Sequence, residues 1–535
     1  MFQQNFEMSS PGSLCELALD SLGKYVYELC TELTKLSGRV SKCKSKQIKS
    51  TCTANIQIAK LVCAKLHNML AEVPAVLANV LTNKLVDCVD NWEFEVGKCK
   101  KGSLEEQIYI EIVKSVIHPC VSIIEPGQDI LDCSDIFAEA VFCSSLCASF
   151  IINNAHTLKN LRKLRILHSS MRCNFTTVEF PEQLIEFSGR CDDENLIKII
   201  QSCKYLKYLD VFGSKGVTDA SVPHILNLNY LEKLNILETK ITHRGLRTLT
   251  VGLFEKFGNV PPLKYFSFSC SRLNNLECLQ NFSDMKISCQ LITSSVSTLA
   301  ISHLYPFKNI CELQISTTLW KINKILEEMG SQLVFLDVEI EQFTSTSFVS
   351  DNDEAEEDEE FDITKILKVG QYCNKLKCLH ISITYYAFPR MRDFIRELLP
   401  GFQTVRCLTL DIEDENIFEA SDYFNFLIAQ CVNVKKVTLA FDRRIFNVYK
   451  FICNIIQLGY MKYLELICFQ PFCNRCAIER KSQNDFSQSK VDEILQLLIF
   501  HCPNLRIIGL EPAFQRNCEF NPQRLKFVPT WCRCK

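Results

Sequence analysis

The C-terminal cysteines are the residues of this chain whose spacing comes closest to that of a metal site. Cys473 and Cys476 form a C-x-x-C pair, and Cys518, Cys532 and Cys534 follow it. Four thiolates could bind zinc in a tetrahedral site. However, the stretch between the pair and the later cysteines is far longer than in a zinc ribbon, and the chain contains 30 cysteines. We therefore expect free or packed thiols, and no bound metal or cofactor.

Catalytic patterns are otherwise missing from the sequence. It contains no Gly-rich phosphate loop, no H-E-x-x-H and no G-x-S-x-G motif. A role for Cys473 or Cys476 as a catalytic nucleophile would require a catalytic domain, and none is visible. The sequence therefore predicts a non-enzymatic protein.

One segment is dense in carboxylates. Residues 351–362 read Asp-Asn-Asp-Glu-Ala-Glu-Glu-Asp-Glu-Glu-Phe-Asp. Such a run repels itself and cannot pack, so we expect a disordered loop. It lacks the glycine and the ligand spacing of a calcium loop. A solvated loop and a contact with a basic partner are both compatible with it.

Composition and charge exclude several classes of protein. The net charge of −3 gives the chain no strong positive potential that would attract nucleic acid. The N-terminus lacks the regions of a signal peptide, and many cysteines without such a peptide indicate a reducing compartment, cytoplasmic and/or nuclear. The longest apolar run, 136–152, contains Glu139 and is too short for a membrane span. We expect it to be a buried helix, with no membrane contact.

A spacing of apolar residues, C-x-x-L-x-x-L-x-L, recurs along most of the chain. Its clearest copy runs from Cys502 to Leu510. About twelve copies occur at intervals of roughly 25 to 45 residues, which is close to the period of solenoid repeats. The copies begin at Cys203, Leu228, Phe307, Cys373, Phe402, Cys431, Leu458 and Cys502, and weaker ones at Leu161, Leu263, Val296 and Leu333.

The last two apolar residues of each copy share one face of a short strand. One strand cannot bury that face alone, so neighbouring copies must stack. The spacing resembles the leucine-rich repeat. The opening cysteine, and the steps Val217-Thr218-Asp219 and Ile241-Thr242, resemble the cysteine-containing subtype common in F-box and related ligase receptors. The resemblance implies an α/β leucine-rich-repeat solenoid over residues 156–515, with parallel strands on its concave face, after an N-terminal all-α domain.

Side chains that alternate with the buried ones would line the concave face of such a solenoid. Among them, aromatic residues often anchor interfaces. Carboxylates outnumber lysines, which favours a basic ligand or an N-terminal amine, although any one position could be an ordinary solvated side chain. The candidate substrate-binding residues are Tyr208, Asp210, Lys233, Tyr265, Asp337, His380 and Glu465.

Residues 13–26 have the apolar spacing of an amphipathic helix, with a turn and a cap at Pro11-Gly12-Ser13. They resemble a BC box, the helix by which substrate receptors dock to elongin C. Leu14, Ala18 and Leu22 hold the aliphatic, small and aliphatic places of that motif, and Ala18 stands where the family usually has Cys. The resemblance implies that Leu14 enters a pocket on elongin C. The alternative is an ordinary first helix of a bundle.

A second helix with docking features is expected at 73–85, because Pro suits the first turn of a helix. Val73-Pro74-Ala-Val-Leu77 resembles a cullin box, closer to the cullin-2 form than to the cullin-5 form. This implies that Val73, Pro74 and Leu77 contact the cullin. The same residues are similar to the opening of an F-box, and a plain helix start would also contain them.

The order of these features resembles the zyg eleven and Zer-one family of cullin-2 ubiquitin-ligase receptors, without that family's armadillo-like C-terminal region. It implies a substrate-recognition subunit of a cullin-2-type ligase that docks to elongin B/C and binds a protein substrate on the solenoid. The alternatives are a leucine-rich-repeat interaction scaffold, or an F-box-type receptor, with no elongin contact.

The expected organisation has four parts. A flexible N-terminus covers residues 1–12, and a helical adaptor-docking domain covers 13–155, in which the helix at 134–150 would cap the first repeat. The solenoid at 156–515 and a Cys-containing tail at 516–535 complete the chain.

Overall fold

The structure is a computed structural model of the 535-residue chain. It forms two compact units, Met1–Phe266 and Ser267–Lys535. The acidic segment 351–362, the helix expected at 134–150, the weak repeat copy at Val296 and the C-terminal cysteines from Cys473 onward that were considered for zinc lie outside the described residues. The described residues are 11–40, 47–96, 104–125, 151, 155–166, 180–270, 279–280, 282, 284–291, 306–317, 325–341, 372–384, 402–412, 428, 431–442, 453, 456–457, 461–472, 488–510 and 526–529.

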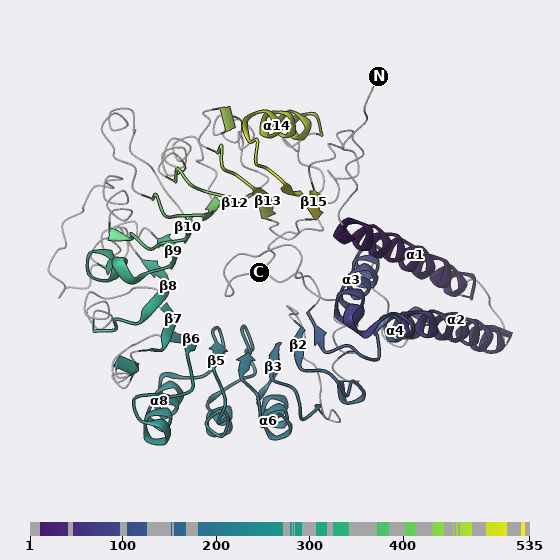
Figure 1. Cartoon of the computed structure of the whole chain (residues 1–535), viewed down its shortest axis with the longest axis horizontal. Coiled ribbons are helices and arrows are strands. Elements are labelled where there is room, and N and C mark those ends of the chain that lie inside the picture. The colour runs from purple at the N-terminus through teal and green to yellow at the C-terminus, as the bar shows by residue number, and fades with distance from the viewer. Residues whose placement is uncertain are drawn as a thin grey trace. The chain divides into compact units, whose positions relative to one another are not determined.

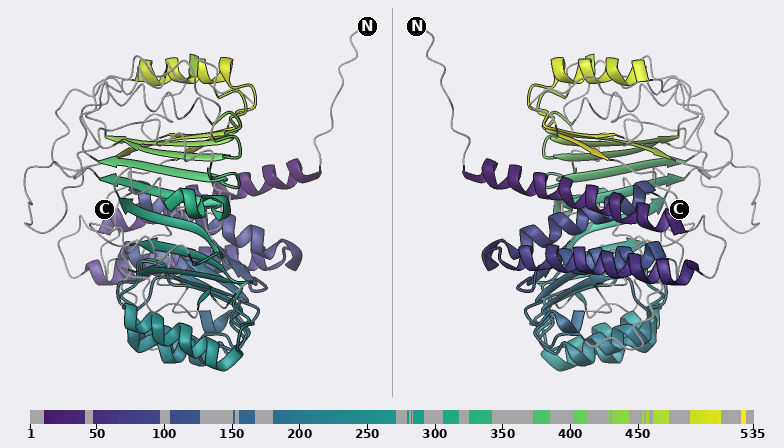
Figure 2. Two further views of the ribbon diagram at one scale, coloured as in Figure 1. Left: turned by 90° about the vertical axis from the view of Figure 1, so that its left-hand side faces the viewer. Right: turned by 90° about the vertical axis from the view of Figure 1, so that its right-hand side faces the viewer.

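The first unit opens with a helical region (Figures 1 and 2). Its apolar residues recur at helical spacing and meet in a common core, as at Val26, Cys30 and Leu33 of the first helix. That helix begins at Pro11, so Ser13 lies in its first turn and is not the cap that was expected. The elements are α1 (Pro11–Val40), α2 (Gln47–Ala71), the 3-10 helix η1 (Ala75–Leu77), α3 (Ala78–Val96) and α4 (Leu104–Val116).

Parallel strands follow in chain order in the first unit. Leu164, Phe187, Leu209 and Leu234 lie beside one another across four of them and are all buried. The strands are β1 (Ile123–Ile124), β2 (Lys163–Ile166), β3 (Glu186–Gly189), β4 (Tyr208–Asp210), β5 (Lys233–Ile236) and β6 (Tyr265–Cys270), the last of which crosses the boundary between the units.

Helices α6 (Asp193–Ser202), α7 (Val222–Ile225) and α8 (His243–Phe257) connect these strands and lie on their buried face (Figure 1). Their starts are linked from repeat to repeat. The Asp193 carboxylate accepts hydrogen bonds from Thr218 N–H at 2.8 Å and Thr218 Oγ1 at 2.6 Å.

The next repeat has the same link. The Asp219 carboxylate accepts bonds from Thr242 N–H at 2.7 Å and Thr242 Oγ1 at 2.5 Å. A Cβ at Gly245 would overlap this carboxylate, so glycine is required there. The Thr-Asp steps read from the sequence therefore fix the start of each helix to the repeat before it.

The second unit repeats the parallel arrangement. Its strands are β7 (Lys286–Leu291), β8 (Ile310–Thr317), β9 (Phe335–Glu341), β10 (Cys378–Thr384), β11 (Cys407–Ile412), β12 (Lys436–Asp442), β13 (Leu466–Phe472), β14 (Ile507–Leu510) and β15 (Lys526–Pro529). One buried row runs across seven of these strands, through Leu313, Leu336, Leu379, Leu408, Val437, Ile467 and Ile508. Helix α14 (Gln488–His501) precedes β14. The parallel strands and their apolar spacing confirm the leucine-rich-repeat fold with an N-terminal helical region.

One predicted copy is wrong in register. Strand β13 pairs with β12 so that Ile467 lies beside Val437 and Phe469 beside Leu439. The repeat therefore begins at Met461 and not at Leu458. Apolar residues occupy the positions that both registers require, so spacing alone could not distinguish them.

Four strands were not predicted. In β3 the expected fourth apolar residue is Gly189, and in β7 an irregularity between Ile287 and Ser288 breaks the spacing. Strands β1 and β15 pair with β2 and β14, and they lie before and after the range 156–515 that was expected for the repeats.

Candidate functional site

Helix α1 buries one face and exposes another near its start. Leu22 is half-buried next to the core residue Val26, whereas Ala18 is exposed and Leu17 is 64 % exposed. The side chain of Leu14 lies outside the described part of the helix. Of the predicted adaptor-binding residues in α1, Ala18 is therefore accessible and Leu22 partly so.

The segment around Pro74 is held from behind by a buried histidine. His118 Nε2 lies 3.1 Å from the carbonyl oxygen of Val73, and His118 N–H donates to Thr82 Oγ1 at 3.0 Å. The backbone N–H of Cys120 donates to His118 Nδ1 at 3.0 Å. Because Nδ1 accepts, we assign the proton to Nε2, which donates to Val73. Val73 is thus half-buried and fixed, while Pro74 is exposed.

Two asparagines of α3, one helical turn apart, connect this helix to β1, the first strand of the sheet. Asn79 Oδ1 accepts bonds from the N–H groups of Ser122 at 2.8 Å and Ile123 at 3.1 Å. Asn83 Oδ1 accepts from Glu125 N–H at 2.9 Å, and its amide donates to the carbonyl of Ile123 at 3.2 Å. This asparagine clamp, Asn79 and Asn83, satisfies backbone groups along the edge of β1.

The remaining side of η1 and α3 is apolar and exposed. Val76 is 84 % exposed, Val80 is more than half exposed and Leu77 just over a third, while Ala78 and Leu81 between them are buried. Exposed aliphatic groups on a well-anchored element are a typical mark of a protein-docking surface.

The helices α1 and α3 bring the two predicted docking segments toward each other. Lys84 Nζ bonds Asp20 Oδ1 at 2.7 Å, and a Cβ at Gly23 would come within 2.7 Å of Cys88 Sγ. From the first contact to the second, the residue numbers increase in both helices, so α1 and α3 run in the same general direction where they meet. The first turns of the two helices therefore lie on the same side of their crossing. We call the exposed residues there the docking end, consisting of Leu17, Ala18, Val76, Leu77 and Val80.

The candidate substrate-binding residues of the first unit share the face of its strands opposite the buried apolar row, although Asp210 itself is only 5 % exposed. The Lys233 ammonium lies 5.8 Å from the ring centroid of Tyr208, whose hydroxyl bonds Asp210 Oδ2 at 3.2 Å. Burial raises the pKa of Asp210, and its hydrogen bonds and Arg165 oppose that rise. Tyr265 is half-buried on β6. The structure thus joins Tyr208, Asp210 and Lys233 into one cluster.

In the second unit, a histidine bridges two carboxylates on the corresponding face. His380 Nδ1 lies 3.0 Å from Asp337 Oδ1, and His380 Nε2 lies 2.9 Å from Asp411 Oδ2. Burial lowers the pKa of the imidazole, but the two carboxylates raise it by more, to about 10. His380 is therefore an imidazolium ion at neutral pH.

Glu465 does not belong to this face. It precedes β13 and bonds Lys435 Nζ at 2.6 Å, at the turn into the strands. Its expected place on the strand face follows from the repeat register that begins at Leu458, and this placement is wrong for the same reason.

Sequence reasoning missed the residues that hold the docking segments in place. His118 was one of nine scattered histidines, and nothing in its surroundings singled it out. Asn79 and Asn83 did carry a signal, because two amides four residues apart interrupt the apolar face of a helix start.

The cysteines of the described part are free thiols. Burial raises the pKa of Cys203, Cys373 and Cys502 to about 12, so these thiols stay protonated and pack as small apolar groups. Among the described residues, no group of three or more His, Cys, Asp or Glu could hold a metal ion.

Within the same residues, no single helix is long and apolar enough to cross a membrane. One bent pair, Ala54–Ala71 with Ala75–Val89, meets the requirement jointly, by length and composition only.

Comparison with known proteins finds similar solved structures, among them an internalin and the complex of Rad7 and Elc1. An internalin from Listeria monocytogenes has 14% sequence identity and a TM-score of 0.26, covering 67% of this chain and 83% of its own. The complex of Rad7 and Elc1 from yeast has 13% identity and a TM-score of 0.35, covering 97% of this chain and 98% of that chain. No family model matches the sequence, and no curated protein matches it. At these identities and scores, the two structures say nothing about what this chain binds.

Proposed function

We propose that this chain is a non-enzymatic substrate-recognition subunit of a cullin-2-type ubiquitin ligase, acting in the cytoplasm and/or nucleus. Elongin B/C would dock on the start of α1, cullin-2 on η1 and the start of α3, and a protein substrate on the face of the repeat strands opposite the buried apolar row.

The docking end is the observation that carries this proposal. The BC-box-like and cullin-box-like segments are far apart in the sequence, yet their exposed apolar groups lie on the same side of the helix crossing. A helical region that served only to cap the repeats would need the asparagine clamp, but it would not need Val76 and Val80 exposed to water.

The charge of the second unit supports a basic substrate segment or an N-terminal amine. On the strand face around His380, carboxylates come from Glu312, Asp337, Glu339 and Asp411. These carboxylates are largely withdrawn from water, so they would attract a cation more strongly than exposed ones would.

The alternative is an interaction scaffold, or an F-box-type receptor, that never contacts elongin. The alanine at position 18, in place of the usual cysteine, favours this alternative. In this alternative, the chain would bind its partners on the strand faces, and elongin would not bind the docking end.

The deciding experiment mixes the purified full chain with elongin B/C and then with cullin-2, and measures both affinities. We expect Leu17→Asp to abolish elongin binding, and Val76→Asp to leave it intact while reducing cullin-2 recruitment. Val260→Asp, at an equally exposed apolar position in the repeats, is the control for folding and solubility. Failure of the wild-type chain to bind elongin B/C would exclude the proposal and leave the scaffold.

A further inference from the structure

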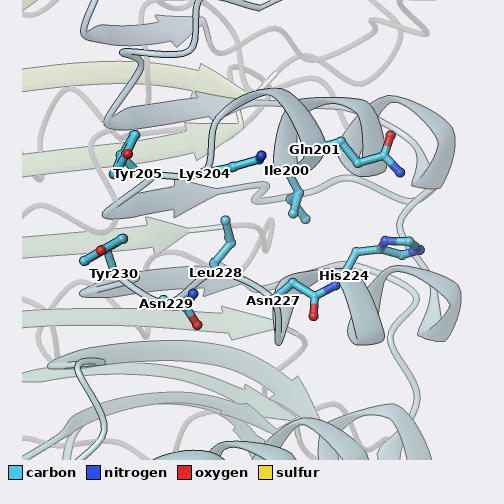
Figure 3. A pocket seen from close by; sticks show the side chains of 9 residues that line it. All are labelled: Ile200, Gln201, Lys204, Tyr205, His224, Asn227, Leu228, Asn229 and Tyr230. Carbon is cyan, nitrogen blue, oxygen red and sulfur yellow. The ribbon is translucent and has the colours of Figure 1, made fainter.

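A groove opens between two successive repeats of the first unit, on the side where the chain turns into β4 and β5 (Figure 3). Its volume is about 440 Å³, and the buried side chains of Ile200 and Leu228 form its apolar floor. It is separate from both the docking end and the strand face that carries Tyr208 and Lys233, because its residues come from the turns and helices between strands.

Two tyrosines at equivalent repeat positions form one end of the groove. Tyr205 is 60 % exposed and Tyr230 is 51 % exposed, with ring centroids 5.7 Å apart and planes at 33°. Such a pair presents a continuous aromatic surface to solvent. Aromatic surfaces of this kind take up large, rigid apolar groups at low entropic cost.

The polar groups along the rest of the groove can all donate hydrogen bonds. Gln201 and His224 lie at the end away from the tyrosines, and Asn227 and Asn229 line one side (Figure 3). Lys204 lies on the opposite side and forms no ion pair with a described residue. The lining contains no carboxylate, and the ammonium group of Lys204 gives the groove positive charge.

We propose that this groove binds a proline-rich extended segment of a partner protein that carries a carboxylate. Proline has no N–H, and a polyproline II segment leaves its carbonyl oxygens unbonded, so such a ligand is rich in acceptors. The asparagine and glutamine amides supply the matching donors, the tyrosine pair contacts the pyrrolidine rings, and Lys204 pairs with the carboxylate.

The same chain contains a matched control position. Lys462-Tyr463 in the second unit occupies the repeat position of Lys204-Tyr205, and Tyr463 is also exposed. There the lysine lies over the tyrosine ring, 4.8 Å from its centroid, and the neighbouring repeats have asparagine, Asn433 and Asn504, in place of a second tyrosine. Loss of Tyr463 therefore removes one exposed tyrosine without affecting a pair.

The test titrates the full chain with a fluorescein-labelled proline-rich peptide that bears one glutamate, and follows anisotropy. We expect Tyr205→Ala or Tyr230→Ala to weaken binding about tenfold or more, as for an interface anchor. Tyr463→Ala should leave the affinity unchanged, Tyr205→Phe should retain most of it, and Lys204→Glu should weaken it.

Unchanged melting temperatures would show that these exposed substitutions leave the fold intact. The inference is overturned if a peptide with alanine in place of proline binds equally well, or if the folded tyrosine variants bind like the wild type. Neither result depends on elongin or a cullin, so the outcome is independent of the proposed ligase role.

Discussion

His380 sits between two carboxylates, and its protonation therefore affects stability. Its pKa in the folded chain is about 10, against an ordinary value of 6.5. The folded chain thus binds one more proton than the unfolded chain between these two pH values. The stabilisation is fully present below about pH 6.5 and is lost as the pH rises toward about 10, by at most about 1.4 kcal/mol per pH unit.

We expect His380→Gln to lower the free energy of unfolding at pH 7 by about 1–3 kcal/mol, because a buried carboxylate loses its partner. The variant should also lose stability less steeply than the wild type between pH 7 and 10. Melting curves at several pH values measure both effects, with His224→Gln as the control. Parallel curves for the wild type and His380→Gln would contradict the ion pair.

The repeat cysteines allow a second measurement at single residues. Because burial keeps their thiols protonated, peptides containing Cys203, Cys373, Cys431 and Cys502 should resist alkylation in the native chain and react fully in denaturant. Cys120 is exposed and should react in both. Peptide-resolved mass spectrometry reads the two classes, and rapid native labelling of Cys203 or Cys502 would refute the packed-thiol interpretation.

At the scale of elements, the Thr-Asp links tie the helical segments that begin after Thr218 and Thr242 to the repeat before each of them. We expect Asp219→Ala to destabilise the chain by about 1–2 kcal/mol, because Thr242 loses the acceptor for its N–H and hydroxyl. Glu255→Ala, which removes an exposed carboxylate from the same α8, should change stability by less than about 0.5 kcal/mol. Urea unfolding of both variants measures the difference, and equal midpoints would contradict the role of the link.

Elements with a strong internal period could be predicted from the sequence. The buried rows through Leu209 and Leu379 follow directly from apolar spacing, because every repeat must bury the same positions. Strand β3 could not be predicted because Gly189 takes the place of an apolar residue. The predicted register of β13 is wrong because its apolar residues fit two registers. The docking end could be proposed only from motif likeness, because no local pattern in the sequence shows that Val76 faces water or that His118 holds Val73.

At the scale of the whole molecule, the proposed role predicts separable losses of binding. If Leu14 enters a pocket on elongin C, Leu14→Ala should cost about 2–3 kcal/mol of affinity, or about 30- to 150-fold. Leu22→Ala should weaken elongin binding less, because Leu22 partly packs in the core. Pro74→Ala should spare elongin binding and reduce cullin recruitment. Calorimetric titrations give the affinities, and unchanged elongin binding by a folded Leu14→Ala chain would exclude the BC-box assignment.

The asparagine clamp also covers the edge of the sheet, because it binds backbone groups of β1 and the residues beside it. An uncovered strand edge is a template on which another chain can pair. We expect Asn79→Ala with Asn83→Ala to promote self-association, seen by light scattering, while Val76→Asp and Val80→Asp should not. A double variant that stays as monodisperse as the wild type would show that the clamp is not needed to close the edge.

The clamp and the exposed valines belong to one short stretch of helix. A molecule that presents Val80 in its native position has therefore already closed the first edge of its sheet, and a molecule with an open edge presents no ordered docking end. Partner binding would then select correctly folded molecules. Only chains whose β1 edge is covered, and which therefore cannot pair with one another through that edge, would enter the assembly.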